Sequence, residues 1–197
     1  MTRLLPLTAL LLIFIITGCG GMVREEVLTS SEASNTRYAT YNLNGADLMI
    51  ESVVISQELK AVFGPFIIIP TFASEVEIIN EPLTIKFLIF VKHGEAIIDL
   101  NTISVVINET GTHLPIKKEI ERAVYLESGR RDYTWVPIFD AITLTARNIP
   151  YSFNLTFDIQ REDVESFRLS FGDLIINGKP AIVKPVYFKR LFRTIGR

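Results

Sequence analysis

The sequence has very few of the residues on which enzyme chemistry most often depends. It contains one cysteine and only two histidines in 197 residues. Because Cys19 is the only cysteine, the chain can form no internal disulfide. His93 and His113 lack the helical spacing of a zinc-binding pair, and no Gly-x-Ser-x-Gly nucleophile motif occurs. We therefore expect a protein that is not an enzyme, with no catalytic residues, no metal site and no dissociable cofactor.

The chain also lacks an excess of positive charge. It has 20 lysines and arginines against 22 aspartates and glutamates, a formal net charge of −2. Nucleic-acid binding requires a basic, aromatic-rich surface, so we expect no nucleic-acid partner. Hydrophobic residues make up 48% and charged residues 21% of the chain, which is typical of a folded globular protein.

The N-terminus has the pattern of an export signal. Arg3 supplies a positive charge, an apolar run extends from Leu4 to Ile16, and the small residues Thr17 and Gly18 follow. The run is shorter than the about 20 apolar residues that a membrane-spanning helix needs. We interpret residues 1–18 as a cleavable signal peptide.

The end of this signal resembles the lipobox of bacterial lipoproteins. Ile16-Thr17-Gly18-Cys19 has an aliphatic residue, a small residue, glycine and then the cysteine that becomes the mature N-terminus. The resemblance implies cleavage between Gly18 and Cys19, a diacylglycerol thioether on Cys19 and an acyl chain on its amino group. It implies attachment to a bacterial cell membrane. The residue after the cysteine is Gly20 rather than aspartate. In a host with two membranes the resemblance therefore implies sorting to the outer membrane, with the protein facing the periplasm or the cell surface.

The segment after Cys19 is rich in small polar residues. Gly20-Gly21 and the stretch from Thr29 to Thr36 have little periodic hydrophobicity. Such residues bury too little surface to offset the entropy of ordering them. We therefore expect a flexible tether over residues 19–44, followed by a single domain over residues 45–197.

Apolar residues of this domain recur with a period of two, which indicates β-strands. In Phe153–Gln160 four large apolar residues alternate with four polar ones, as in a half-buried strand. Leu83–Val91 is apolar on both faces, as in a central strand. Helical periodicity is weak throughout. The pattern predicts an all-β fold, an immunoglobulin-like β-sandwich, with a small β-barrel as the alternative.

Asn177-Gly178 predicts a hairpin near the C-terminus, because both residues accept positive φ angles. It should join a strand over 173–176 to one over 181–184. Pro180 and Pro185 lack the backbone donor of a central strand, so the second strand should be an edge or be interrupted.

Large apolar residues elsewhere are expected to fill the core. They include the only tryptophan, Trp135, and the stretch from Val62 to Pro70. The alternative interpretation of that stretch is an exposed surface that contacts a partner.

The C-terminal segment is basic and contains no acidic residue from Lys184 onward. With its interleaved apolar residues it could contact anionic lipid or an acidic partner through Lys189, Arg190, Arg193 and Arg197. We favour the simpler interpretation of a last strand followed by a solvated tail, and expect deletion of residues 192–197 to leave folding intact.

These observations favour a membrane-anchored, non-catalytic module that binds or scaffolds a protein partner of the cell envelope. The alternative is a lipid or small-ligand carrier, in which some of the 13 phenylalanines would line a cavity. A less favoured alternative is an envelope hydrolase that uses one of two acidic groups, formed by Glu75, Glu77 and Glu81 and by Glu162, Asp163 and Glu165.

Overall fold

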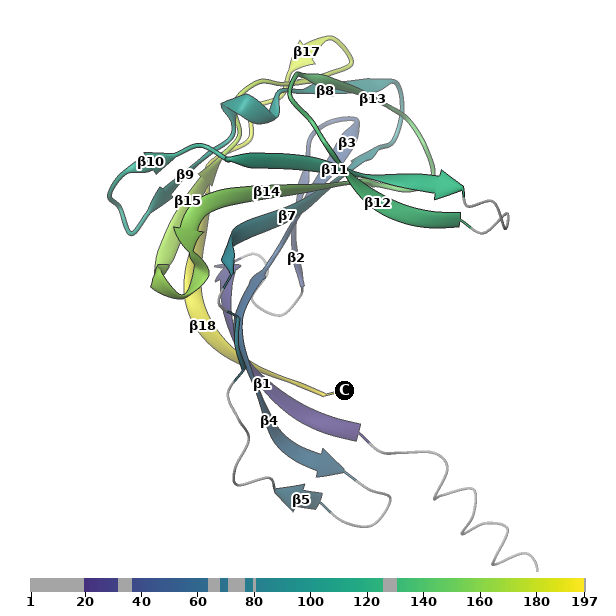
Figure 1. Cartoon of the computed structure of the whole chain (residues 1–197). Coiled ribbons are helices and arrows are strands. Elements are labelled where there is room, and N and C mark those ends of the chain that lie inside the picture. Colours follow the sequence, from purple (N-terminus) through teal and green to yellow (C-terminus); the bar gives the residue numbers. More distant parts are fainter. Residues whose placement is uncertain are drawn as a thin grey trace, which may run out of the picture. The chain divides into compact units, whose positions relative to one another are not determined.

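The computed structural model describes residues 20–31, 37–63, 68–70, 77–79, 81–125 and 131–196. The proposed signal peptide, with Gly18, and the proposed lipid-attachment residue Cys19 lie outside these residues. Within them the chain forms strands and two short 3₁₀ turns but no α-helix, so the predicted all-β class is confirmed (Figure 1). None of the described segments is a helix of the length and hydrophobicity that crossing a membrane requires.

The strands alternate with short connections along the whole described chain. Their bounds are β1 Gly20–Ser30, β2 Tyr38–Asn42, β3 Ala46–Glu51, β4 Val53–Phe63, β5 Ile68–Pro70, β6 Glu77–Ile78, β7 Pro82–Val91, β8 Glu95–Ile98, β9 Ser104–Ile107, β10 Thr112–His113, β11 Lys117–Tyr125, β12 Arg131–Pro137, β13 Ile142–Thr145, β14 Tyr151–Gln160, β15 Ser166–Ser170, β16 Leu174–Ile176, β17 Lys179–Pro180 and β18 Val186–Gly196. The 3₁₀ turns are η2 Leu100–Thr102 and η3 Arg161–Asp163.

The strands form three sheets. The first has the order β10-β9-β15-β18-β1-β4-β5, with β6 also paired to β4; the second is β12-β11-β14-β7-β3-β2; the third is β13-β8-β16-β17. The chain divides into two compact units. Unit 1 takes its residues from 1–27, 54–79 and 192–197, and unit 2 from 28–53 and 80–191.

Strand β7 lies inside the six-stranded sheet of unit 2, between β14 and β3 (Figure 1). Its residues Leu83, Ile85, Phe87 and Ile89 are fully buried, and the residues between them are half-buried. This is the central strand that apolar residues on both faces predict. Strand β14 buries Phe153, the partner of Phe87 in the ladder, as the alternation from Phe153 predicts.

Aromatic side chains connect the two large sheets in the core of unit 2. Phe87 stacks on Phe153 at 5.0 Å between ring centroids and meets the edge of Phe171, just after β15, at 5.4 Å. On the facing sheet Phe167 stacks on Phe188 at 4.4 Å. Two sheets that share an apolar core in this way form a β-sandwich, as predicted. One sheet is also a half-barrel, a feature of the predicted alternative.

The predicted hairpin is present. Asn177 and Gly178 adopt φ angles of 52° and 73° between β16 and β17, and Ile176 pairs with Lys179. The second strand is Lys179–Pro180 rather than residues 181–184. It is the last strand of its sheet, which is the edge position expected from the prolines.

The prediction of a flexible tether over residues 19–44 is wrong for the two strands that lie within it. Residues 20–30 form β1, which lies between β18 and β4, and residues 38–42 form β2. Val23, Val27 and Leu28 are buried. These few apolar residues suffice because neighbouring strands, distant in sequence, supply the hydrogen bonds that order the backbone.

The structure differs from the expectation for Trp135 and, in part, from the expectation for the C-terminal segment. Trp135 is half-buried rather than a core residue, because it lies on β12 at the edge of its sheet, where Lys86 Nζ lies 5.6 Å from the ring centroid. The C-terminal segment continues as strand β18 to Gly196, so the strand interpretation is confirmed and its solvated tail is not found there. Of the apolar stretch at 62–70, residues 64–67 lie outside the described chain.

Candidate functional site

The residues that sequence reasoning considered for catalysis do not gather into a site. His93 lies in the turn between β7 and β8, and His113 lies in β10. Over the described ranges, no group of three or more histidine, cysteine, aspartate and glutamate residues could hold a metal ion.

Two of the six acidic residues considered for hydrolysis, Glu81 and Glu165, lie in ion pairs. Glu81 accepts a hydrogen bond from Arg161 at 3.3 Å, and Glu165 pairs with Arg190 at 3.1 Å. Burial lowers the pKa of the Arg161 guanidinium, and the charge of Glu81 acts in the opposite direction. Glu75 lies outside the described residues. Each of these two carboxylates therefore neutralises an arginine of the protein itself.

The basic residues considered for membrane or partner contact are also divided. Lys189 is exposed, but Arg190 pairs with Glu165 and Arg193 pairs with Glu25 at 3.0 Å. Arg197 lies outside the described residues. The two described arginines thus hold carboxylates of the protein itself.

Glu25 is the most deeply buried carboxylate among these pairs. Its side chain is 4% exposed; Oε2 accepts hydrogen bonds from Nε and Nη2 of Arg193, at 3.1 and 3.0 Å. Oε1 accepts one from Nε2 of Gln57 on β4, at 2.9 Å. One residue earlier in each of β1 and β18, the Arg24 guanidinium lies 4.2 Å from the ring centroid of Phe192. These contacts join β1, β4 and β18 inside unit 1 and have a structural role.

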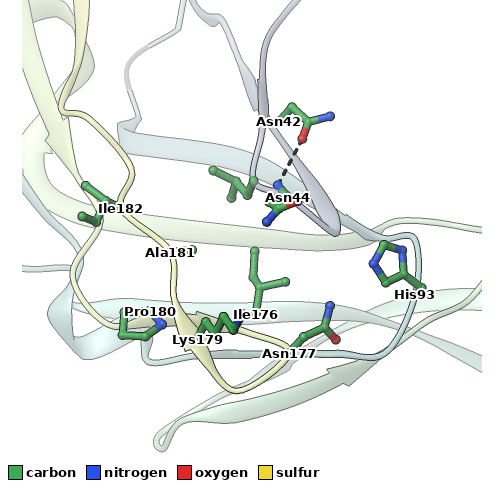
Figure 2. Close-up of a pocket in the computed structure, with 10 residues that line it drawn as sticks. Asn42, Asn44, His93, Ile176, Asn177, Lys179, Pro180, Ala181 and Ile182 are labelled. Carbon is green, nitrogen blue, oxygen red and sulfur yellow. Dashed lines mark hydrogen bonds between the residues drawn. The ribbon is translucent and has the colours of Figure 1, made fainter.

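A pocket of ≈ 590 Å³ lies in unit 2 where three turns converge (Figure 2). One side is formed by the turn after β2, with Asn42, Leu43 and Asn44, and the other by residues 176–182 around the β16–β17 hairpin. His93 lies at one end of the pocket in this view. Asn42 Oδ1 accepts a hydrogen bond from the Asn44 backbone at 3.1 Å, which shapes the turn.

Asn177 holds these turns together. Its Oδ1 accepts a hydrogen bond from the Glu95 N–H at 3.1 Å, and its own N–H donates to the Glu95 carbonyl at 2.9 Å. Gly94 has φ +72°, and a β-carbon there would lie 1.9 Å from Asn177 Oδ1. The backbone N–H of Lys92 donates to the Gly45 carbonyl at 2.9 Å, which connects the turn after β2 to the turn between β7 and β8. Only glycines fit between the turns at this distance.

A second hollow of ≈ 560 Å³ adjoins the first and shares Asn42, Leu43 and Ile182 with it. It lies between residues 40–43 of β2 and the connection from Ile182 to Tyr187 that leads from β17 into β18. We call the two hollows together the β2 groove. Ile182 is 90% exposed and Tyr187 62% exposed, so apolar surface is presented to solvent at this groove.

The charge of the β2 groove has one sign. Lys179 and Lys184 lie among its lining residues, both exposed, and neither pairs with a carboxylate in the part of the chain that the structure describes. The described residues that line the two hollows include no aspartate or glutamate. The groove is therefore suited to ligands with acidic and apolar groups.

Sequence reasoning did not identify this groove. It identified the turn at Asn177-Gly178 as a connection between strands, but did not place it beside the other two turns. Nothing in their local pattern indicates that they meet each other, or that β2 exists. Comparisons of the chain with known protein families, with curated proteins and with solved structures find no match.

Proposed function

We propose that this protein is a bacterial lipoprotein whose β-sandwich is a non-catalytic module that binds a protein partner at the cell envelope. The observation that carries the binding role is the β2 groove, in which exposed apolar side chains and two exposed lysines, with no described carboxylate as partner, lie beside a strand at the edge of its sheet. Exposed apolar surface rimmed by polar residues is typical of protein-binding sites.

Support for the membrane anchor comes from Ile16-Thr17-Gly18-Cys19. A diacylglycerol on Cys19 and an acyl chain on its amino group together supply the two or more chains that stable anchoring requires. Strand β1 begins at Gly20, directly after this residue. The proposed anchor would therefore join a sheet strand without a long intervening spacer.

The packing of five phenylalanines in unit 2 favours a binding module over a lipid carrier. Phe87 contacts Phe153 and Phe171, and Phe167 contacts Phe188, so these rings fill a core by stacking on each other. The ion pairs of Glu81 and Glu165 likewise favour a binding module over a hydrolase.

Metabolic labelling in a bacterium with two membranes tests the anchor. Cells that express the full chain receive an alkyne-bearing fatty acid, and labelled protein is followed through membrane fractionation. We expect the wild type and Thr17→Ser, which keeps a small residue in the lipobox, to be labelled and sediment with membranes. Cys19→Ser should lose the label because the thioether cannot form. Equal labelling of Cys19→Ser would overturn the lipoprotein assignment.

Affinity purification of the lipidated protein from solubilised membranes tests the binding role. Bound proteins and bound lipids are both identified by mass spectrometry. A protein partner in stoichiometric amount is the expected result. Recovery of a stoichiometric lipid ligand without any protein would favour the carrier and contradict the proposal.

A further inference from the structure

We propose that the β2 groove binds an extended peptide segment with acidic and apolar side chains, and that this segment adds as a new strand to the open edge of β2. The inference deepens the proposed function by assigning the partner-binding site and the chemistry of what it binds. It rests on the binding role, but not on the lipid anchor.

The direction of the backbone groups of β2 follows from its pairing with β3. Leu43 N–H donates to the Ala46 carbonyl at 2.8 Å, and Ser52 N–H donates to the Arg37 carbonyl at 2.9 Å. In an antiparallel pair, hydrogen-bonded positions alternate with positions whose N–H and C=O point away from the partner strand. Arg37 and Leu43, both odd-numbered, are hydrogen-bonded to the strand that contains β3. The even-numbered residues of β2, such as Thr40 opposite Met49, therefore direct their N–H and C=O groups away from β3.

Among the described strands, none pairs with the side of β2 away from β3. Strand β2 ends the six-stranded sheet, and the backbone groups of Thr40 and Asn42 that point outward form no hydrogen bond with any described residue. A row of such groups is a template for pairing with another strand. Binding by strand addition uses these main-chain groups for affinity and neighbouring pockets for side-chain specificity.

The opposite wall of the groove also has backbone groups available. Ala181 N–H donates to the Leu174 carbonyl at 2.8 Å, but residues 182–185 belong to no strand and have no backbone hydrogen bond with the described chain. Pro185 ends this stretch before β18 begins. A peptide in the second hollow would therefore lie between this connection and β2, which presents regularly spaced donors and acceptors.

The lining of the groove selects the composition of the peptide. Successive side chains of an added strand point to opposite faces. Ile182 and Tyr187 offer apolar contacts, and Lys179 and Lys184 offer cations with no acidic side chain among the described lining residues. Apolar residues interspersed with aspartate or glutamate complement this surface, whereas basic peptides would be repelled.

The test is selection from a phage-displayed library of short linear peptides on the full-length protein, purified with its anchor in detergent. We expect enriched sequences in which acidic and apolar residues alternate. Affinities of the synthetic peptides are then measured by fluorescence anisotropy. Failure to enrich any peptide, or enrichment of basic peptides, would overturn the proposal.

Thr40→Pro is the variant that blocks the edge. Thr40 is exposed and its N–H points away from β3, so proline removes an outward donor and leaves the β2–β3 ladder intact. Thr40→Val keeps the N–H and is the matched control. We expect peptide affinity to fall about tenfold or more with Thr40→Pro, as the loss of one or two backbone hydrogen bonds implies, and to be unchanged with Thr40→Val. Equal affinity for the two variants would contradict strand addition.

A second measurement leaves the protein unchanged. Selected peptides are N-methylated at alternate residues, which removes donors on one side of the added strand at a time. One methylation pattern should abolish binding and the other should be better tolerated. Equal tolerance of both patterns would contradict strand addition even if Thr40→Pro failed to fold.

Two results distinguish peptide binding at the β2 groove from self-association and from partner binding at another site. If light scattering shows a dimer of the wild type that dissociates in the Thr40→Pro variant, the β2 groove binds a second copy of the chain and the peptide proposal is wrong. A stoichiometric partner that binds Thr40→Pro as well as Thr40→Val would uphold the binding function but place its site elsewhere.

Discussion

Asn177 and Gly94 show how single residues shape the candidate site. The Asn177 side chain bonds to Glu95 across the space that a β-carbon at position 94 would occupy. The Asn177-Gly178 turn was predictable, because positive φ angles are a local property of these two residue types. The role of Gly94 was not, since it depends on a residue more than eighty positions away, as the spacing of 82 between Asn177 and Glu95 shows.

Gly94→Ala should destabilise the protein more than Gly178→Ala. Both glycines have positive φ, +72° and +73°, so alanine is strained at either position by about 1–2 kcal/mol. Only Gly94 faces a close atom, because the alanine would displace Asn177 Oδ1 and break its bond to Glu95, for an additional about 1 kcal/mol. Urea denaturation followed by circular dichroism measures the difference. Equal losses for the two variants would show that the Asn177 contact contributes nothing.

At the scale of elements, strands with a continuous apolar face were predictable from the sequence, whereas β1 was not. Alternation within Phe153–Gln160 and Leu83–Val91 was enough to predict β14 and β7, because each carries a continuous apolar face. Strand β1 carries a buried glutamate in the same position pattern as its buried valines, so its composition indicated a tether. The buried Glu25 carboxylate is bound by Arg193, from the other end of the chain, and by Gln57 of β4.

Arg193→Ala should lower the free energy of unfolding. It removes the ion pair between Arg193 and Glu25, which is 3% exposed, and breaking a fully buried pair costs about 3–5 kcal/mol. Because the Arg193 side chain is 23% exposed, we expect about 2–3 kcal/mol. Denaturant titration measures it, with exposed Lys189→Ala as the control, expected within about 0.5 kcal/mol of wild type. A loss no larger than that of the control would mean that water replaces the arginine.

The same contact changes the expected result of truncating the C-terminus. Deletion of residues 192–197, expected from the sequence to leave folding intact, removes Arg193 and the end of β18. We now expect that deletion to destabilise unit 1 at least as much as Arg193→Ala does, with purified yield and denaturation midpoint as the measurements.

At the scale of the whole molecule, the β-sandwich depends on aromatic contacts between sheets. Phe87 is fully buried, stacks on Phe153 and meets Phe171. The all-β class was predictable because the period of two recurs in many short segments. Which strands pair was not, since the sheets join strands that are far apart in sequence, as β7 with β14 and β18 with β1 illustrate.

Phe87→Ala should cost about 3–5 kcal/mol, because it leaves a cavity that the rigid sheets cannot close. Phe139→Ala is the matched control: Phe139 is 76% exposed, so its truncation should change stability by less than about 0.5 kcal/mol. Chemical denaturation of the full chain distinguishes the two. Similar small losses in both variants would mean that the stacked rings contribute little to the core.

The sequence by itself determined the properties that depend on neighbouring residues: the alternation of strands, the turn at Asn177-Gly178 and the lipobox-like residues that end at Cys19. The tertiary structure decided the neighbours of β1, the convergence of three turns around Asn177 and the open edge of β2. The physical reason is that a strand's composition determines which face it buries, whereas its partners are selected by the packing of the complete set of strands. The edge position of β2 among the described strands is a property of that complete set, and no segment of the sequence carries it alone.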